Sequence, residues 1–396
     1  MESIRKIYKK GYGPSSSHTM GPNYAAIEFK KRNPNAARFR VTLHGSLAAT
    51  GKGHGTDHAI GRGLAPVEVE IVWKPEVVPD FHTNGMLFEA LDASGTVADS
   101  WTIYSIGGGE LANEDTHSDK VHVYEHNTIG EILQYIKSEG LTFWEYVQDR
   151  EEEDLWDYLQ EMWEAMQQTI REGVREEGVL PGGLKLRRKA RQYFVRASSY
   201  KPSLQTRALV TAYALATSER NAVGGTIVTA PTCGSSGVLP AVLYHLKQNH
   251  DFTDTNILRA MATAALFANV IKTNASISGA EVGCQGEIGS ACVMAAVAAN
   301  QLFGGSPKQI EYAAEMAMEH NLGLTCDPLC GLVQIPCIER NAIAALRALD
   351  INIYAMMSDG SHLITFDKVV RAMNDTGKDL PRLYKETSLG GLALPD

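Results

Sequence analysis

The sequence predicts a multidomain protein in which an N-terminal α+β domain is followed by a mainly all-α helical domain. Two observations support this. Strand-like and helix-like patterns alternate up to about residue 138, whereas helical patterns dominate after residue 140. The chain has 396 residues, of which 44% are hydrophobic, and this is enough for more than one hydrophobic core.

The first domain is assigned to residues 1–140. β-Branched and aromatic residues with partial alternation predict strands, and apolar residues at helical spacing predict helices at 24–32 and 128–140. The strand candidates are 38–46, 67–73, 85–92, 96–106 and 120–125.

One long amphipathic helix is expected next, over residues 144–178, within a connecting segment at 141–180. Its apolar stripe, at steps of three and four, is Leu155, Leu159, Met162, Met166 and Ile170. Pro181 and the two glycines after it end this pattern. Residues 181–396 then read as an all-helical domain whose most apolar stretches, including 290–303, are buried alanine-rich helices.

Composition argues against several classes of partner. A net charge of −9 does not attract phosphate backbones or anionic lipid, so we expect no nucleic acid and no membrane partner. The apolar stretch 290–303 is too short to span a bilayer, and the first residues do not resemble a secretory signal. We therefore expect a cytoplasmic protein whose six cysteines are reduced.

Three of these cysteines stand in turns marked by glycine or proline: Cys284, Cys326 and Cys337. Such turns are expected to expose thiolates at helix ends, where backbone N–H dipoles lower the pKa of a thiol. Cys292 lies in an apolar helix and reads as a small buried hydrophobe. Spacing alone leaves both a metal site and plain burial open. If the three thiolates converge, they suit a [4Fe–4S] cluster with one open iron.

Seven motifs occur in an order that resembles the iron–sulfur-dependent L-serine dehydratases, in the single-chain form with fused β and α domains. The resemblance covers essentially the whole chain. The motifs are GPSSSHTMGP (13–22), GSLAATGKGHGTDHAI (45–60), YSIGGG (104–109), TAPTCGSSGVLPA (229–241), NASISGAEVGCQGEIG (274–289), EHNLGLTCDPLCGLVQIPCIERNAIA (319–344) and YKETSLGGLA (384–393).

This resemblance implies a [4Fe–4S] cluster held by Cys284, Cys326 and Cys337, and a helical domain that is catalytic. It implies conversion of L-serine to pyruvate and ammonia without pyridoxal phosphate, a step of amino-acid catabolism that can feed gluconeogenesis. It also implies that the N-terminal domain resembles an allosteric substrate-binding domain. Many members carry a cysteine after the GGLA segment that caps the open iron. This sequence ends in GGLALPD, so we expect water or Cys233 at that iron; Cys330 is taken as structural.

Elimination of water also requires a base for the α-proton and a seat for the charged groups of the substrate. His54, between two glycines, is the expected base, and Lys272 in an apolar stretch is a second catalytic candidate. The flanking glycines argue against a helical zinc site made by His54 and His58. The expected substrate-binding residues are Ser15, Ser16, Ser17, His18, Lys52 and Asn274. The serine loop is expected to bind an anion or, through Thr19, to cap the N-terminus of the next helix.

The sequence is also compatible with other functions. A related lyase acting on L-threonine or L-cysteine differs from a serine enzyme by little binding energy. A pyridoxal-phosphate enzyme needs a Schiff-base lysine in a phosphate context, which neither Lys52 nor Lys272 has. A non-catalytic amino-acid-binding regulator would not need three turn cysteines. A homodimer is the default expectation for the assembly.

Overall fold

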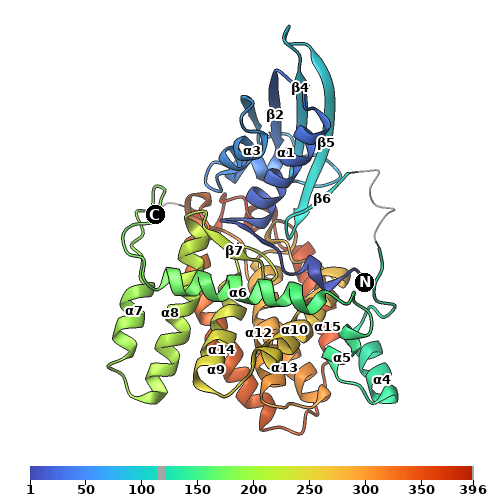
Figure 1. Cartoon of the computed structure of the whole chain (residues 1–396), viewed down its shortest axis with the longest axis vertical. Coiled ribbons are helices and arrows are strands. Elements are labelled where there is room, and N and C mark those ends of the chain that lie inside the picture. Colours follow the sequence, from blue (N-terminus) through green and yellow to red (C-terminus); the bar gives the residue numbers. More distant parts are fainter. Residues whose placement is uncertain (114–120, 395–396) are drawn as a thin grey trace.

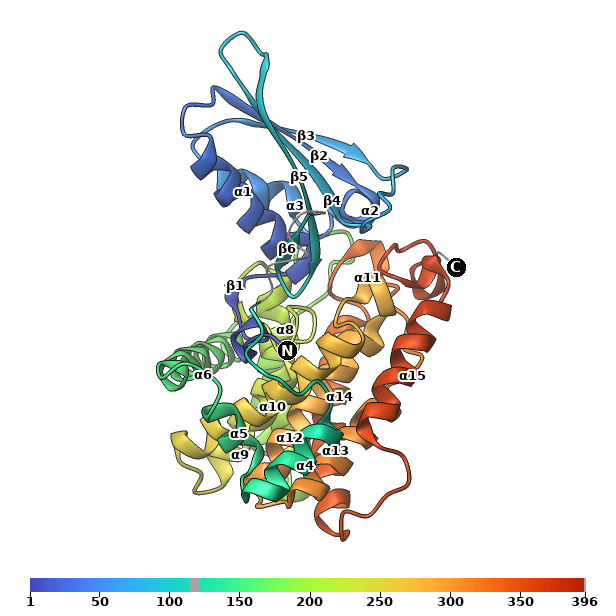
Figure 2. The same cartoon turned by 90° about the vertical axis from the view of Figure 1, so that its right-hand side faces the viewer.

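A small α/β region stands on a larger helical body in the computed structural model, which describes residues 1–113 and 121–394 (Figures 1 and 2). This arrangement confirms the predicted fold class.

The α/β region is built on a five-stranded sheet with the order β3-β2-β4-β5-β6. Only β2 and β3 run parallel, and the other neighbouring pairs are antiparallel. The strands are β2 (Arg38–His44), β3 (Val69–Lys74), β4 (Gly85–Leu91), β5 (Val97–Gly107) and β6 (Glu110–Ala112). A parallel pair needs a crossover, and here it contains α2 (Gly45–Thr50) and α3 (Thr56–Leu64). Helix α1 (Gly21–Arg32) lies beside α3 on one face of the sheet (Figure 2).

Alternation along β2 decides which face of the sheet is buried. Phe39, Val41 and Leu43 are all fully buried in one hydrophobic core with Phe29 of α1. Arg40 points the other way, and its guanidinium pairs with the Glu89 carboxylate of β4 at 2.7 Å. The strands predicted at 38–46, 67–73, 85–92 and 96–106 are confirmed.

The strand predicted at 120–125 is wrong for residues 121–125, and residue 120 lies outside the described residues. The amides of Val123 and Tyr124 both donate to the carbonyl of Met1 rather than to a neighbouring strand. The alternating pattern therefore reflects burial of Tyr124 against the helical body.

The helical body is centred on α10 (Asp254–Asn274) and α12 (Ser290–Leu302). Every residue of α12 from Ser290 to Asn300 is buried, as expected for an alanine-rich core helix. The surrounding helices are α4 (Ile129–Glu139), α7 (Ala190–Ala197), α8 (Pro202–Ala222), α9 (Val238–Asn249), α13 (Pro307–Glu319), α14 (Cys337–Met356) and α15 (Phe366–Asp379). Among the described residues, none of these helices combines the length and apolarity that crossing a bilayer requires.

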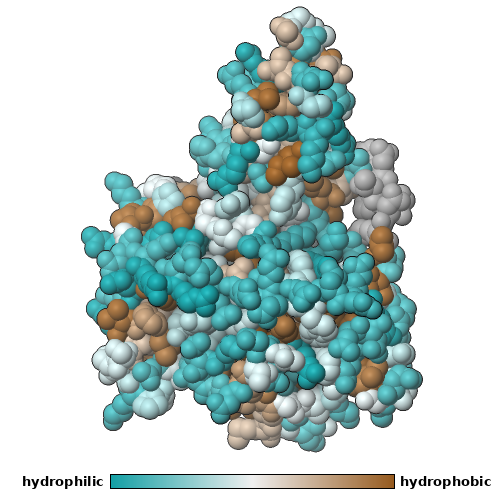
Figure 3. Space-filling model, in the orientation of Figure 1, coloured by the Kyte–Doolittle hydropathy of each residue, from teal (hydrophilic) through white to brown (hydrophobic). Residues whose placement is uncertain are grey.

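The single long helix predicted from 144 to 178 is wrong, because the structure has two helices there: α5 (Phe143–Gln148) and α6 (Leu155–Gly173). The break is the run of charged residues at 149–154. Glu151 in this run accepts hydrogen bonds from the Ser3 hydroxyl and the Ile4 amide, so the N-terminal segment fixes the chain between the helices. The apolar stripe itself is buried on α6, and the face of α6 seen in Figure 3 is mostly hydrophilic.

The two cores divide the chain differently from the predicted limits at residues 140 and 180. Met1, Ile4 and Tyr8 are buried in the core of the helical body, together with side chains of α4 and α6. Strand β1 (Lys10–Tyr12) pairs antiparallel with β7 (Thr226–Val228) of that body. The N-terminal segment thus belongs to the helical body, and the chain enters the α/β region only after residue 12.

Candidate active site

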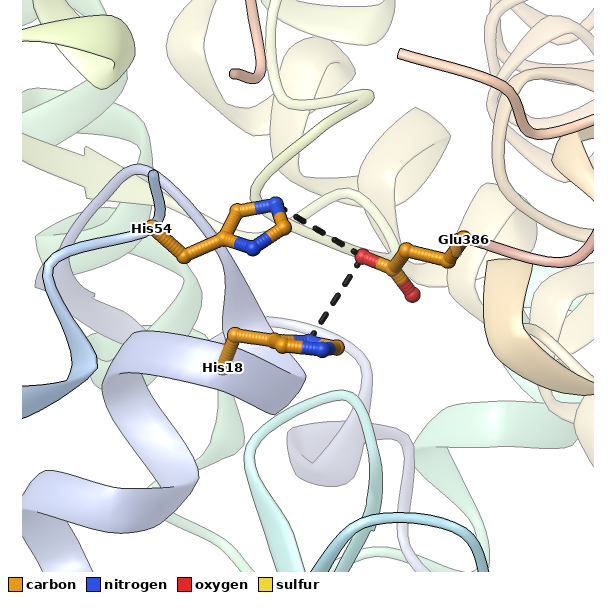
Figure 4. Close-up of side chains that lie close together, drawn as sticks. All are labelled: His18, His54 and Glu386. Carbon is orange, nitrogen blue, oxygen red and sulfur yellow. Dashed lines mark ion pairs between the residues drawn. The ribbon is translucent and has the colours of Figure 1, made fainter. Parts of the chain in front are cut away.

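Two histidines of the α/β region meet a carboxylate of the C-terminal segment at the junction of the two parts (Figure 4). The ring centroids of His18 and His54 are 4.5 Å apart. The Glu386 Oε1 atom lies 3.6 Å from His18 Nδ1 and 3.8 Å from His54 Nε2. Both histidines are completely buried, so this is an interior cluster and not a surface patch.

Local chain geometry places His54. Gly51 to Gly55 form a turn between α2 and α3, and Gly55 has φ +62°, a left-handed conformation that suits glycine. His54 therefore lies outside a helix, as the flanking glycines predicted, while His58 lies exposed on α3. The His54 carbonyl accepts a hydrogen bond from the Thr19 hydroxyl at 2.8 Å, which ties the turn to the serine loop.

The protonation state of His54 follows from its surroundings. Burial lowers the pKa of His54 to about 4, although the hydrogen bond at the Thr50 carbonyl opposes this shift. Because the Nδ1 atom is 3.1 Å from that carbonyl oxygen, Nδ1 carries the proton and Nε2 carries the lone pair. The Nε2 atom is buried and has no hydrogen-bond partner among the described residues. His54 thus presents a free, unprotonated nitrogen at neutral pH.

The serine loop holds the second histidine. Ser16–Met20 form a short π-helix whose N-cap is Ser15, so the N-cap expected at Thr19 is made instead by Ser15. The Ser17 hydroxyl is 2.8 Å from His18 Nδ1, and the Ser46 hydroxyl is 3.1 Å from His18 Nε2. Burial, and then the neighbouring His54, lower the pKa of His18 well below its usual value.

The predicted cysteine site lies next to this cluster. Cys284 precedes a short π-helix at Gln285–Gly289, Cys326 lies in the loop after α13, and Cys337 begins α14. The Cys284 and Cys326 sulfurs and a Glu287 carboxylate oxygen all lie within 4.8 Å of one another. Cys337 interacts electrostatically with Cys284. Three thiols from distant parts of the sequence therefore converge.

Cys326 and Cys337 are not the low-pKa thiols that their turns predicted, and Cys284 is not exposed. Cys284 and Cys326 are 3% and 4% exposed. The hydrogen bond with Cys284, and then burial, raise the pKa of the Cys326 thiol well above its usual value, and burial raises that of Cys337. The expectation failed because the turns that carry Cys284 and Cys326 are buried in the interior. Buried thiols of this kind hold protons until a metal replaces them.

The cysteine site also contains charged side chains that the sequence did not single out. Burial, and then Glu386, raise the pKa of Glu287 to about 8. Burial, and then Cys284, raise that of Glu386 to about 8 as well. Burial by itself lowers the pKa of Arg340, but Cys284, Cys337 and Cys326 more than offset this and raise it. The Arg340 guanidinium thus supplies positive charge beside the thiols.

Gly279 makes room for this arrangement. A Cβ atom at position 279 would lie 3.0 Å from Glu287 Oε2 and 3.1 Å from Cys326 Sγ. The close approach of backbone to sulfur and carboxylate is possible because glycine has no side chain.

The C-terminal segment closes the site from the side of the cysteines. The Cys326 amide donates to the Tyr384 carbonyl at 2.7 Å, and the Glu386 amide donates to the Cys326 carbonyl at 2.8 Å. The Ser46 hydroxyl of α2 donates to the Glu386 carbonyl at 3.0 Å. One residue, Glu386, therefore connects the cysteine loop with the histidine cluster.

The structure does not bring every candidate residue to this place. Lys272 pairs with Glu110 at 2.7 Å and with Glu2 at 3.0 Å, and neither carboxylate belongs to the histidine or cysteine cluster. The Asn274 amide donates to the carbonyls of Asn127 and Val270 at the end of α10.

Lys52 is exposed, and its ammonium lies 5.6 Å from the ring of Trp73. It lines a cleft of about 310 Å³ together with His54 and Gln334. Lys52 therefore stands at an opening that leads to His54.

The remaining cysteines have separate environments. The Cys233 sulfur is 3.1 Å from the sulfur of Met20, in a small apolar cluster with Ile227. Cys330 is exposed in a tight turn with φ +55°. Cys292 is fully buried in α12, which confirms its interpretation as a core residue.

Comparison with known proteins covers nearly the whole chain. The family model described as "Serine dehydratase beta chain" matches residues 3–72, and the one described as "Serine dehydratase alpha chain" matches residues 88–393. The chain is 41% identical to the "L-serine dehydratase" of Streptomyces coelicolor, over 99% of this chain and 98% of that protein. It is 40% identical to the "L-serine dehydratase" of Haemophilus influenzae and to "L-serine dehydratase 2" of Escherichia coli, each over 100% of this chain and 99% of the relative.

Proposed function

Because the chain belongs to the serine dehydratase family, we propose that it converts L-serine to pyruvate and ammonia with a [4Fe–4S] cluster and without pyridoxal phosphate. The observation that carries this proposal is the convergence of the buried Cys284 and Cys326 thiols with the partly buried Cys337 thiol, beside an unprotonated histidine. The thiols suit iron–sulfur binding, and the histidine suits removal of an α-proton.

The donor set fits a cluster with three protein ligands. Cys284, Cys326 and Cys337 would hold it, and the Arg340 guanidinium beside them would offset the negative charge of their thiolates. Gly279 leaves room next to Cys326 that any side chain would fill. When bound, the cluster would supply a Lewis acid at its open iron for the leaving hydroxyl group of the substrate.

The residues of the chain perform the other steps. His54 Nε2 takes the proton from Cα, since its lone pair is free and its Nδ1–H is held by Thr50. The hydroxyls and backbone amides around Ser15, Ser16 and Ser17 form a seat for the substrate carboxylate, as their loop predicted. Loss of the hydroxyl group then gives aminoacrylate, whose imine form hydrolyses to pyruvate and ammonia.

Lys272 is a weaker candidate for a catalytic role than His54. Its ammonium has two carboxylate partners within 3.0 Å, Glu2 and Glu110, and these ion pairs give it a structural role. The same contacts disfavour a Schiff-base role, and Lys52 lies exposed over Trp73. The pyridoxal-phosphate alternative therefore has no suitable lysine among the two considered.

A combined measurement tests the proposal. The protein is purified without oxygen, its iron and sulfide are quantified, and pyruvate release from L-serine, L-threonine and L-cysteine is compared. Iron and sulfide near four each per chain, with pyruvate released fastest from L-serine, is the expected result. Amino-acid binding without any keto-acid release would instead indicate a regulator, and a sharp aldimine absorption band would indicate pyridoxal phosphate. Sedimentation in the same buffer tests the expected homodimer.

A further inference from the structure

Glu386 has a backbone conformation that few residues adopt. Its φ is +57°, in the left-handed region, which is strained for a residue other than glycine. Two hydrogen bonds hold the backbone in this conformation. The Glu386 amide donates to the Cys326 carbonyl, and the Glu386 carbonyl accepts from the Ser46 hydroxyl. Strain that the surroundings maintain often serves to aim a side chain at a functional site.

The carboxylate aimed in this way lacks a cationic partner of its own. Its side chain is 8% exposed and faces two histidines whose pKa values are lowered, so both are uncharged at neutral pH. Within residues 1–113 and 121–394, no lysine or arginine nitrogen lies within 4.0 Å of it. A buried carboxyl group without a cationic partner suits a cation that arrives with a ligand, because the cation stabilises the ionised carboxylate that burial disfavours.

The proposed reaction specifies where such a cation would be. The Cα atom of an amino acid carries both the hydrogen that the base removes and the ammonium group. A group that binds the ammonium must therefore lie beside the base, and Glu386 Oε1 is 3.8 Å from His54 Nε2. The hydroxyl on Cβ must reach the cluster that the cysteines would hold. The backbone amide of Glu386 donates a hydrogen bond to the carbonyl of one of these cysteines, Cys326. Glu386 thus stands between the two groups that act on neighbouring carbons.

We propose that Glu386 binds the α-ammonium group of the substrate and so selects α-amino acids over hydroxy acids. This inference rests on the proposed function for the identity of the reaction. The ammonium offers three donors and no acceptor, which matches the two acceptor oxygens of a carboxylate. Glu287 is less suited, because its carboxylate lies with the Cys284 and Cys326 sulfurs and is hydrogen-bonded by the Thr232 hydroxyl.

Two ligands separate ammonium binding from general damage. L-alanine has the ammonium and the carboxylate but no hydroxyl to eliminate, whereas glycerate has a hydroxyl in place of the ammonium. Calorimetry on the iron-loaded protein gives a dissociation constant for each. We expect Glu386→Gln to weaken L-alanine binding about tenfold or more, because a hydrogen-bonded charge pair is lost. Glycerate binding should change by less than about twofold, since no ammonium is involved.

The controls keep the test decisive. Glu152→Gln removes a carboxylate that is 85% exposed and should change neither constant. Glu386→Asp retains the charge and should give an intermediate loss for L-alanine. Unchanged L-alanine binding in Glu386→Gln overturns the inference, and so does an equal loss for both ligands. If the unaltered chain releases no pyruvate while L-alanine binding still depends on Glu386, the proposed reaction is wrong and the ammonium seat stands.

Discussion

The cysteine site and the histidine cluster are assembled in different ways. The three cysteines and Arg340 all come from the helical body, so the packing of that body alone brings them together. The histidines come from the α/β region and meet Glu386, which is bonded to the cysteine loop, where the two parts join (Figure 4). In the proposed mechanism, metal binding and proton removal are therefore separable, and a change in one half of the site should leave the other half measurable.

We expect the largest effect from Cys326→Ala, which changes the cysteine half of the site. Loss of one of three thiolates should remove the cluster and with it all pyruvate release, because three ligands are the minimum in the proposed site. Iron and sulfide content of the purified protein is the measurement. Cys292→Ala is the matched control, since that thiol is buried in α12 and donates a hydrogen bond to the Ala344 carbonyl at 3.6 Å. A Cys326→Ala protein with normal iron would refute the ligand assignment.

His54→Ala should remove the proposed base in the histidine cluster and leave the cysteine site intact. Removing the base is expected to lower kcat by about 10²–10⁴-fold, while iron and sulfide remain at the level of the unaltered protein. Exchange of the serine α-hydrogen with deuterated water should stop as well. His58→Ala, four residues away and exposed on α3, serves as the control. Normal exchange in His54→Ala would move the base to another residue, with His18 and Lys272 to be tested next.

The pH dependence of the reaction tests the histidine half of the site separately from the cysteine half. Because burial lowers the pKa of His54 to about 4, its neutral, basic form persists well below the usual histidine range. The acid limb that His54 contributes to kcat/KM should therefore lie near pH 4, apart from the limb of Glu386, whose pKa burial and Cys284 raise to about 8. The unfolded chain binds this proton near its ordinary pKa of about 6.5, so the contribution of His54 to stability is complete above that pH and is lost as the pH falls toward 4. An acid limb centred at 6.5 would point to a solvated base.

Ser46→Ala should have the smallest effect, because it weakens only the connection between the halves. The Ser46 hydroxyl bridges His18 Nε2 and the Glu386 carbonyl, and its loss is expected to cost about 1 kcal/mol in the free energy of unfolding. Thermal unfolding and kcat are the measurements, with a severalfold fall in kcat at most. Ser138→Ala, at an exposed position of α4, should leave both unchanged. A loss of iron in Ser46→Ala would show that the two halves are not separable.

Short-range patterns predicted those parts of the molecule that short-range forces determine. Alternation in β2 and the buried alanines of α12 were visible in the sequence because each pattern repeats within one element. The break between α5 and α6 was not visible, because it depends on Glu151 meeting the N-terminal segment.

The same limit applies to the site. The three cysteines could be singled out by residue type and motif, but Glu287, Arg340 and Glu386 could not. Carboxylates and arginines are usually solvated, and only tertiary contacts remove these three from water. One signal in the sequence pointed to them: all three lie inside the motifs of the resemblance, at 274–289, 319–344 and 384–393.

The place of Glu386 in the chain has a consequence for biosynthesis. A ribosome makes His18 and His54 first and the cysteines much later, and Glu386 follows all of them. The α/β region can form its own core while the helical body is still being translated, since the buried residues of that core lie between 25 and 103. The proposed substrate site is complete only after residue 386 has emerged from the ribosome. A nascent chain therefore passes through a stage in which the cysteine loop is present without the Glu386 segment that is bonded to it, and in the proposed enzyme this stage would give iron and sulfide access to the three thiols.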